Sequence, residues 1–481
     1  MREIIFPRYA FASLKSFTVF TVLTLFALFA LTLAFPASSA LAAAGGAIDF
    51  GALDTEEDMG TAVGGASAGS SQRGGDIEWE VSLGGVGYDS AYSVSPTKDG
   101  GCIVVGRSDS DEYDISGNHG GADFLVVKMS GNGDVEWLKC LGGSKDDDAN
   151  SVQQTSDGGY IVAGWTSSND GDVSGNHGHG NFWIVRLNAK GNIIWQRCLG
   201  GSGFDTGMSI QQTSDGGLIV TGTITSNNGD VSGNHGGIDA WVARLNAKGE
   251  IIWQRCLGGA EKDNALFVQQ TRDGGHIVVG RTKSNDGDVS GNHGGVDAWV
   301  VKLDKRGAIE WQKCLGGLED DSAEAVQQTP DGGYIVAGDT KSNDGDVSGN
   351  HGGRDAWVVK LSAGGAIEWR KCLGGSANDY AKSVHVTADG GYVIAGGSGS
   401  VDGDVSGGHG HWDIWVVNMN KNGLIRWQQC LGGSGAEVGN FVRQVSDGSY
   451  IVVGNTESGD GDVSINRGGK DMWIVKLRKE M

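Results

Sequence analysis

Proline is scarce in this chain, with 4 residues in 481, whereas glycine is abundant, with 85. Without proline-rich or low-complexity tracts, this composition argues against disorder and collagen and indicates many tight turns. Basic residues are also in deficit, because the formal net charge is −22. That charge argues against nucleic acid and anionic membranes as partners and favours cations or basic partners. An acidic surface that serves only solubility is the simpler alternative.

Cysteine motifs typical of metal sites are missing as well, since the chain contains no CxxC. Equivalent positions on stacked sheets lie roughly 10 Å or more apart, whereas a disulfide needs Cα atoms within about 7 Å. We therefore expect free, buried and inert thiols. Six cysteines share one repeat position, three residues after a recurring tryptophan, and Cys102 stands at another core-type position; the six are Cys140, Cys198, Cys256, Cys314, Cys372 and Cys430.

What the chain does contain is a tandem repeat without insertions. Tryptophan recurs every 58 residues, at positions 79, 137, 195, 253, 311, 369 and 427. Such a period indicates one supersecondary unit that packs on copies of itself. Each copy holds four short runs of β-branched and aromatic residues joined by turns such as Asp215-Gly216-Gly217, and no helical window. The sequence therefore predicts an all-β fold, a seven-bladed β-propeller with four antiparallel strands per blade.

The phase of the repeat predicts how the ring closes. The first copy begins at Ile77, in the fourth strand of a blade, and the last copy stops after its third strand, residues 472–477. The N-terminal strand is thus predicted to complete the last blade and to remove an open sheet edge.

The stretches 297–303, 314–317 and 331–338, with Gly307 between the first two, resemble those of the bacterial beta-propeller repeat family of secreted and cell-surface proteins. The resemblance covers residues 77–477. It implies the fold and an exported location, and it implies little about activity.

The N-terminus predicts export. Arg2, Arg8 and Lys15 precede an apolar run over residues 17–35, and Ala40-Leu41-Ala42 follows. This order is typical of a secretory signal peptide, although about 19 apolar residues could also remain as a membrane anchor. We expect a signal peptide over 1–42, a Gly/Ala/Ser-rich linker over 43–75 and the propeller over 76–481. The protein would then be extracellular, on the cell surface or periplasmic, and touch a membrane only through an uncleaved anchor.

A near-identical long loop between the second and third strands carries the candidate metal ligands. In residues 286–297 it places oxygen-bearing side chains at loop positions 1, 3, 5 and 12 and glycine at position 6, the spacing of an EF-hand-type calcium loop. The predicted calcium ligands are Glu112, Asp114, Ser116 and Asp123; Asp170, Asp172, Ser174 and Asn181; Asn228, Asp230, Ser232 and Asp239; Asp286, Asp288, Ser290 and Asp297; Asp344, Asp346, Ser348 and Asp355; Asp402, Asp404, Ser406 and Asp413; Asp460, Asp462, Ser464 and Asp471.

Two departures weaken the calcium hypothesis: position 12 is Asp or Asn rather than Glu, and strands flank the loop. Ordinary turns in which these side chains bond backbone amides are the alternative. Loops beginning at 286, 344, 402 and 460 should bind best. A second acidic position follows each Leu-Gly-Gly and should lie on the same face, as a turn cap or as part of a cation-recruiting surface: Asp89, Asp147, Asp205, Asp263, Asp321, Asp379 and Glu437.

Two further repeated positions have structural interpretations. Six loop histidines, with arginine in the seventh copy, are predicted to bond the backbone of their own loops: His119, His177, His235, His293, His351, His409 and Arg467. The repeated tryptophans are predicted to form the core between blades; stacking on carbohydrate is the alternative.

A catalytic constellation is not recognisable, since residues that break the symmetry form no Ser/His/Asp or paired-carboxylate set; they are Trp165, His179, His276, His385, His411 and Trp412. A quinone-dependent dehydrogenase is the enzyme alternative, because residues 303–311 are loosely similar to those propeller repeats. An asymmetric pocket in the central channel would favour an enzyme. Our leading hypothesis is a monomeric, exported binding or scaffold module, stabilised by calcium and directed at an unidentified protein or glycan. A purely structural ring without metal is the second.

Overall fold

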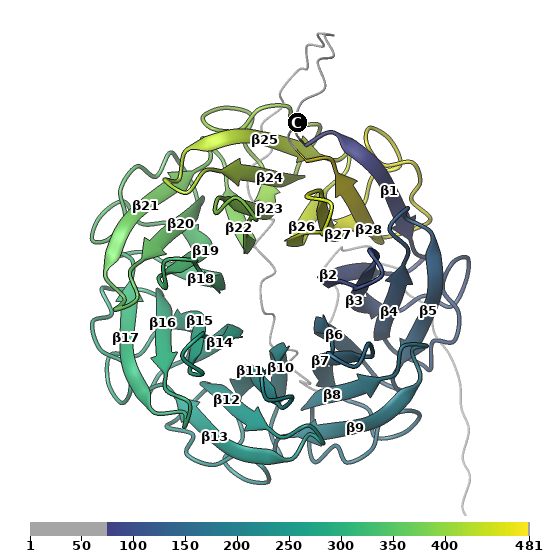
Figure 1. Ribbon diagram of the computed structural model, residues 1–481, viewed down its shortest axis with the longest axis horizontal. Coiled ribbons are helices and arrows are strands. Elements are labelled where there is room, and N and C mark those ends of the chain that lie inside the picture. Colours follow the sequence, from purple (N-terminus) through teal and green to yellow (C-terminus); the bar gives the residue numbers. More distant parts are fainter. Residues whose placement is uncertain (1–74, 480–481) are drawn as a thin grey trace, which may run out of the picture. The chain divides into compact units, whose positions relative to one another are not determined.

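The 58-residue repeat folds into seven four-stranded antiparallel sheets arranged around a central axis (Figure 1). The computed structural model describes residues 75–479, which all belong to one compact unit, Val63–Met481. The predicted all-β, seven-bladed propeller is confirmed, and the described residues contain no helix. Accordingly, no helix long and apolar enough to cross a membrane occurs in 75–479. The predicted signal peptide and almost all of the predicted linker lie outside the described residues.

Each blade is a meander whose strands run in order from the centre of the ring to its edge (Figure 1). The innermost strands are β2 (Asp89–Pro96), β6 (Asp147–Gln154), β10 (Asp205–Gln212), β14 (Asp263–Gln270), β18 (Asp321–Gln328), β22 (Asp379–Val386) and β26 (Glu437–Gln444). The second strands are β3 (Cys102–Ser108), β7 (Tyr160–Thr166), β11 (Leu218–Ile224), β15 (His276–Thr282), β19 (Tyr334–Thr340), β23 (Tyr392–Ser398) and β27 (Tyr450–Thr456).

The third strands are β4 (Asp123–Met129), β8 (Asn181–Leu187), β12 (Asp239–Leu245), β16 (Asp297–Leu303), β20 (Asp355–Leu361), β24 (Asp413–Met419) and β28 (Asp471–Leu477). The outermost strands are β5 (Val135–Leu141), β9 (Ile193–Leu199), β13 (Ile251–Leu257), β17 (Ile309–Leu315), β21 (Ile367–Leu373), β25 (Ile425–Leu431) and β1 (Ile77–Leu83). We call the loop between a second and a third strand the rim loop, and the segment from an outermost strand to the next innermost strand the blade junction.

Strand β1 closes the ring as the repeat phase predicts. It pairs antiparallel with β28, so the seventh sheet has the order β1-β28-β27-β26. The Trp473 indole Nε1 donates to Glu80 Oε2 at 2.8 Å, and Ser82 Oγ donates to Asp471 Oδ2 at 3.3 Å. The predicted closure is confirmed, and β28 has no free edge.

A bulge in every innermost strand explains an invariant glycine in the second strand. In the fourth blade the register between β14 and β15 shifts between Ala265 and Phe267, and Gly280 lies opposite this bulge. A Cβ atom at Gly280 would overlap the backbone carbonyl oxygen of Asn264. Only glycine allows the two strands to approach this closely at the bulge.

The hydrophobic core is divided into seven clusters, each shared by two neighbouring blades. One cluster joins Ile184 of β8 to Trp241 of β12, and the Phe182 and Trp241 rings meet edge to face with centroids 6.1 Å apart. The third-strand tryptophans are buried and those of the outermost strands pack against the clusters half-buried, which confirms their predicted core role. All seven cysteines are free and buried, as predicted, and burial raises the pKa of Cys198 to about 12.

Candidate functional site

The rim loops and blade junctions lie against each other, as the predicted meander requires. Position 1 of each rim loop accepts a hydrogen bond from the junction at the start of its own blade. In the fourth blade Asp286 Oδ1 accepts from the Ala260 amide at 2.9 Å, and in the second Asp170 Oδ1 accepts from the Ser144 amide at 2.8 Å. The position-1 side chain therefore already caps a turn, which is what the alternative interpretation of the loop predicts.

Positions 3 and 5 also have definite contacts. The backbone amide of Asp288 donates to the Gly258 carbonyl at 2.9 Å, and this holds the rim loop to the same junction. The Gln312 Nε2 amide donates to Ser290 Oγ at 2.7 Å. The half-exposed carboxylate of Asp288 makes no hydrogen bond to the described residues, so its oxygens remain free for another ligand.

Position 12 is the buried end of the rim loop. Asp297 is fully buried, and its Oδ2 accepts hydrogen bonds from the backbone amide and the ring Nδ1 of His293, at 3.0 and 2.7 Å. Its Oδ1 has no partner within the described residues. The same arrangement holds at Asp123, Asp239 and Asp355. The histidine ring therefore bonds a side chain of its loop rather than the loop backbone that the sequence suggested.

The position-12 carboxylate faces the second acidic position across the following junction. A Cβ atom at Gly142 would lie 2.5 Å from both Asp123 Oδ1 and Asp147 Oδ2, so glycine leaves room between the two carboxylates. Asp147 Oδ2 accepts from the Gly143 amide and from Ser168 Oγ, at 2.8 and 2.9 Å. Burial is the main cause that raises the pKa of Asp147 to about 6, and the Asp123 charge adds to it. Burial likewise raises the pKa of Asp123.

Each rim loop therefore spans two blade junctions, so its positions 1, 3 and 12 do not gather around a single ion-binding site. Positions 1 and 3 contact the junction before their blade, whereas position 12 faces the junction after it, as Asp355 does beside Gly374. Position 12 of one loop is brought toward position 3 of the next. The Asp172 and Asp404 charges accordingly raise the pKa values of Asp123 and Asp355, after burial and the opposing histidine contacts. No group of three His, Cys, Asp or Glu side chains in metal-binding proximity occurs within 75–479.

Two junctions depart from this pattern in informative ways. Asn181 replaces aspartate, and its Nδ2 donates to the Gly180 and Gly201 carbonyls, both at 3.1 Å. In the seventh copy Arg467 replaces histidine, and its Nη1 lies 2.9 Å from Asp114 Oδ2 and 3.9 Å from Asp471 Oδ2. The guanidinium thus bridges position 12 of the last loop and position 3 of the first. A cationic group is accommodated between these two positions.

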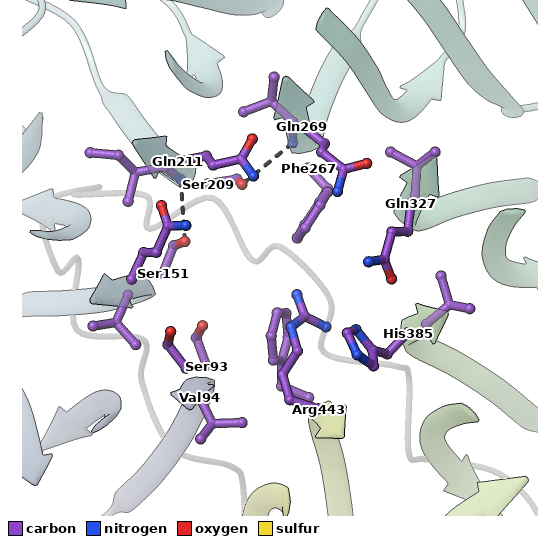
Figure 2. A pocket seen from close by; sticks show the side chains of 18 residues that line it. Ser93, Val94, Ser151, Ser209, Gln211, Phe267, Gln269, Gln327, His385 and Arg443 are labelled. Atoms are coloured by element: carbon purple, nitrogen blue, oxygen red, sulfur yellow. Dashed lines mark hydrogen bonds between the residues drawn. The ribbon is translucent and has the colours of Figure 1, made fainter. Parts of the chain in front are cut away.

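The innermost strands surround a central cavity of about 180 Å³, shown in Figure 2. Repeated serines and glutamines line part of the cavity wall, but Phe267, His385, Phe441 and Arg443 break the symmetry. The asymmetric pocket that would favour an enzyme is thus present, although no Asp or Glu of residues 75–479 lines it. Sequence reasoning singled out His385 alone. The other three are visible only when residues 58 apart are compared, since each is ordinary in its own copy.

The remaining symmetry-breaking residues do not converge on one site. Trp165 packs on Phe204, with ring centroids 5.3 Å apart, and Trp412 packs on Tyr380 at 5.4 Å. His276 is buried edge-on against Trp253. His179 and His411 lie exposed in the rim loops of two different blades.

The fold defines the protein as a seven-bladed β-propeller. No family model matches the chain. The regulatory protein FlaEY of Caulobacter vibrioides is 27% identical over 200 residues, an alignment that covers 37% of this chain and only 20% of the length of that relative. Among solved structures, BamB from Moraxella catarrhalis is 12% identical, with 83% of this chain and 99% of that chain covered and a TM-score of 0.37. The Pan2 WD40 domain of Neurospora crassa is 12% identical, with 84% and 97% covered and a TM-score of 0.46.

Proposed function

We propose that this protein is an exported binding scaffold whose acidic rim is stabilised by calcium ions held at the blade junctions. The observation that carries the proposal is a fully buried aspartate whose Oδ1 has no partner among the described residues, at five junctions; at four of them a histidine bonds the other oxygen. A buried carboxylate oxygen without a hydrogen bond is costly unless a proton or a cation satisfies it. The four aspartates with a histidine partner are Asp123, Asp239, Asp297 and Asp355, and the fifth is Asp471.

The donor set at a junction suits calcium. In the junction after the first blade the side-chain oxygens would come from Asp123 and from the half-exposed Asp172 of the next rim loop, whose charge contributes to the raised pKa of Asp123 after burial. Carboxylate and carbonyl oxygens in a flexible arrangement, completed by water, are the ligands that calcium prefers. Arg467 supports this interpretation, because its guanidinium already lies between Asp114 and Asp471, although Asp471 Oδ1 still has no partner among the described residues.

Export rests on the N-terminal sequence and on the resemblance to secreted repeat proteins. The ligand would be a protein or a glycan that contacts the rim loops, whose exposed residues recur with nearly the same chemistry around the ring. Fractionation of cells that produce the full chain tests export. An array of proteins and glycans, probed with and without calcium, tests binding.

The calcium experiment compares the wild type with D123N/D239N/D297N/D355N by calorimetry and thermal melting, in chelator and in millimolar calcium. Asparagine is already accommodated at this position in the second blade, so the variant should fold. At about ten times the dissociation constant each site adds about 1.4 kcal/mol of stability. We expect heat of binding and a higher melting temperature for the wild type alone. Equal responses, or no response to calcium, would exclude the junction sites.

A ring that binds no metal is the second candidate, and Asn181 favours it. Its amide donates where the aspartates have an unpartnered oxygen, which is how a protonated carboxyl would also behave. If the wild type gains nothing from calcium but melts higher at mildly acidic pH, protons rather than metal ions satisfy these oxygens.

A further inference from the structure

The central cavity combines a repeated polar wall with one positively charged side chain. One position in each innermost strand contributes to it: Ser95, Gln153, Gln211, Gln269, Gln327, His385 and Arg443. The four glutamines make equivalent bonds, in which Oε1 accepts from a backbone amide of the next innermost strand at 2.6–2.7 Å. Their Nε2 groups make no hydrogen bond within the described residues. Each glutamine therefore offers a spare amide donor at the cavity wall.

Arg443 replaces the glutamine in the seventh blade, at a place where the bond cannot form. The next innermost strand has Pro96 at the position of the donating amide, and proline lacks an N–H group. The guanidinium instead lies 4.0 Å from the centroid of the Phe441 ring, and Nη1 donates to the Val442 carbonyl at 2.9 Å. The other donors of the guanidinium have no partner among the described residues, and no carboxylate there forms an ion pair with it.

The charge of Arg443 is thus uncompensated at a half-buried site. By contrast, Arg281 on β15 pairs with Glu324 at 2.5 Å, which raises its pKa. Burial alone lowers the pKa of Arg443, because no acid within 75–479 is close enough to oppose it. Arginine nevertheless remains protonated in proteins at neutral pH. In a chain with a net charge of −22, a cavity that the described residues line with one arginine and no acid favours anions.

The groups beside Arg443 add hydrogen-bond donors and an apolar surface. His385 points toward the cavity beside it (Figure 2), and its buried Nδ1 has no partner in the part of the chain that the structure describes. Phe267 and Phe441 stand where four other blades carry serine, and their rings approach each other across the cavity with centroids 6.5 Å apart. The cavity therefore offers an aromatic face next to a cationic one.

We propose that this cavity binds a small organic monocarboxylate with an apolar or aromatic body. The carboxylate would accept charge-assisted hydrogen bonds from Arg443, which is suited to planar anions, while the body packs on Phe267. A volume of about 180 Å³ accommodates a single ring, since an engineered apolar cavity of about 150 Å³ in another protein holds benzene. This site is distinct from the rim loops and does not depend on calcium there.

Benzoate is the probe, titrated calorimetrically into the full chain in chelator at pH 7. Benzylamine has the same ring with the opposite charge, and sulfate has charge without the ring. The variant R443Q installs the residue of four other blades, R443K keeps the charge, and R255Q on the outer β13 strand is the matched control. Removing a charged hydrogen-bond donor weakens binding by about tenfold or more.

We expect benzoate to bind the wild type and R255Q alike, to bind R443K more weakly, and to lose at least about tenfold in affinity for R443Q. Benzylamine and sulfate should give no comparable heat. Thermal melting verifies that each variant is folded. Failure of benzoate to bind at millimolar concentration, equal binding to R443Q, or equal binding of sulfate would overturn the proposal. A second variant, F267S, should weaken benzoate without creating sulfate binding.

Discussion

The Nδ2 amide of Asn181 lies 3.1 Å from the carbonyl oxygen of Gly201 and donates a hydrogen bond to it across a blade junction. Six other copies carry aspartate at this position, and at five of them Oδ1 has no partner within 75–479. The repeat thus places a hydrogen-bond donor, the Asn181 amide, and acceptors, the aspartate carboxylates, at equivalent buried positions in different blades.

This comparison predicts that N181D is destabilising and D297N is not. In the absence of calcium, N181D should cost about 1–3 kcal/mol of unfolding free energy at pH 8, because it loses a donor and buries an unsatisfied oxygen. D297N should remain within about 1 kcal/mol of the wild type. Urea unfolding in chelator measures both. Equal costs for the two substitutions would show that the hydrogen bond of Asn181 contributes little.

Stability, measured as melting temperature in chelator, should be greatest at about pH 4. Burial raises the pKa of Asp147 and of Asp148 to about 6, from an ordinary value near 4. A group whose pKa is raised by folding stabilises below its unfolded pKa, and this contribution is lost as pH rises from about 4 to 6. The pKa of His119 is raised mainly by its bond to Asp123, so its contribution is lost at higher pH.

Below about pH 4 stability should fall as the pH falls, because other carboxyl groups have pKa values that folding lowers. A hydrogen bond from Thr155 is the main cause that lowers the pKa of Asp157 to about 2, and its contribution is lost as pH falls from about 4 to 2. Asp331 behaves alike, since its bonds to Thr329 and Lys360 outweigh burial and hold its pKa at about 2. The variant D147N should flatten the decline between about pH 4 and pH 6. A melting temperature that rises steadily from about pH 4 to pH 7 would contradict the prediction.

A matched pair of leucine truncations tests the closure of the ring. Leu83 in β1 and Leu141 in β5 occupy the same repeat position, and both are buried. L83A and L141A should each cost about 2–5 kcal/mol of stability. L83A should also accelerate unfolding more, because β1 is joined to β28 by non-covalent contacts alone whereas a short turn ties β5 to β4. Stopped-flow unfolding in urea separates the two effects, and equal unfolding rates would argue against opening at β1.

Two glycine substitutions distinguish close packing from ordinary turn structure. G280A should cost about 3 kcal/mol or more, because its Cβ would overlap the Asn264 carbonyl oxygen opposite the bulge. G364A should stabilise by about 0.4–1 kcal/mol, since Gly364 is exposed and a Cβ there would meet nothing. Thermal melting of both variants measures the difference. A tolerated G280A would mean that β14 and β15 can separate at the bulge.

The fold is largely predictable from the sequence, because the strand and turn pattern of each blade is contained within one 58-residue repeat. The 58-residue period determines the number of blades, and the strand at which it begins determines that β1 completes the last one. The same periodicity predicts that the cysteines are free thiols, since equivalent positions on separate sheets are too far apart for a disulfide. The single exposed surface formed by rim loops and junctions is also predictable, because both connections leave a meander at the same face.

The partners of individual loop residues were not predictable from spacing. The EF-hand-like pattern treats Asp286 and Asp297 as neighbours. In the structure Asp286 caps the junction before its blade, whereas Asp297 lies near Asp321 at the start of the next blade, whose charge adds to the effect of burial on the pKa of Asp297. The calcium hypothesis itself stays a prediction. Arg443 and Phe267 were not predicted as site residues, because the sequence of a single blade gives no reason to single out one arginine or one phenylalanine. Their role becomes apparent only in the structure, where both side chains line the central cavity.

The pairing of β1 with β28 sets the order of events during synthesis. The Ser82 and Asp471 side chains that meet there are 389 residues apart. Blades one to six can complete their sheets as soon as each has been made, but β1 is made before any of them and finds its partner last. Contacts at such separation form slowly. Until then β1 is an unpaired strand, and Glu78 and Glu80 supply the charges that discourage pairing with another chain.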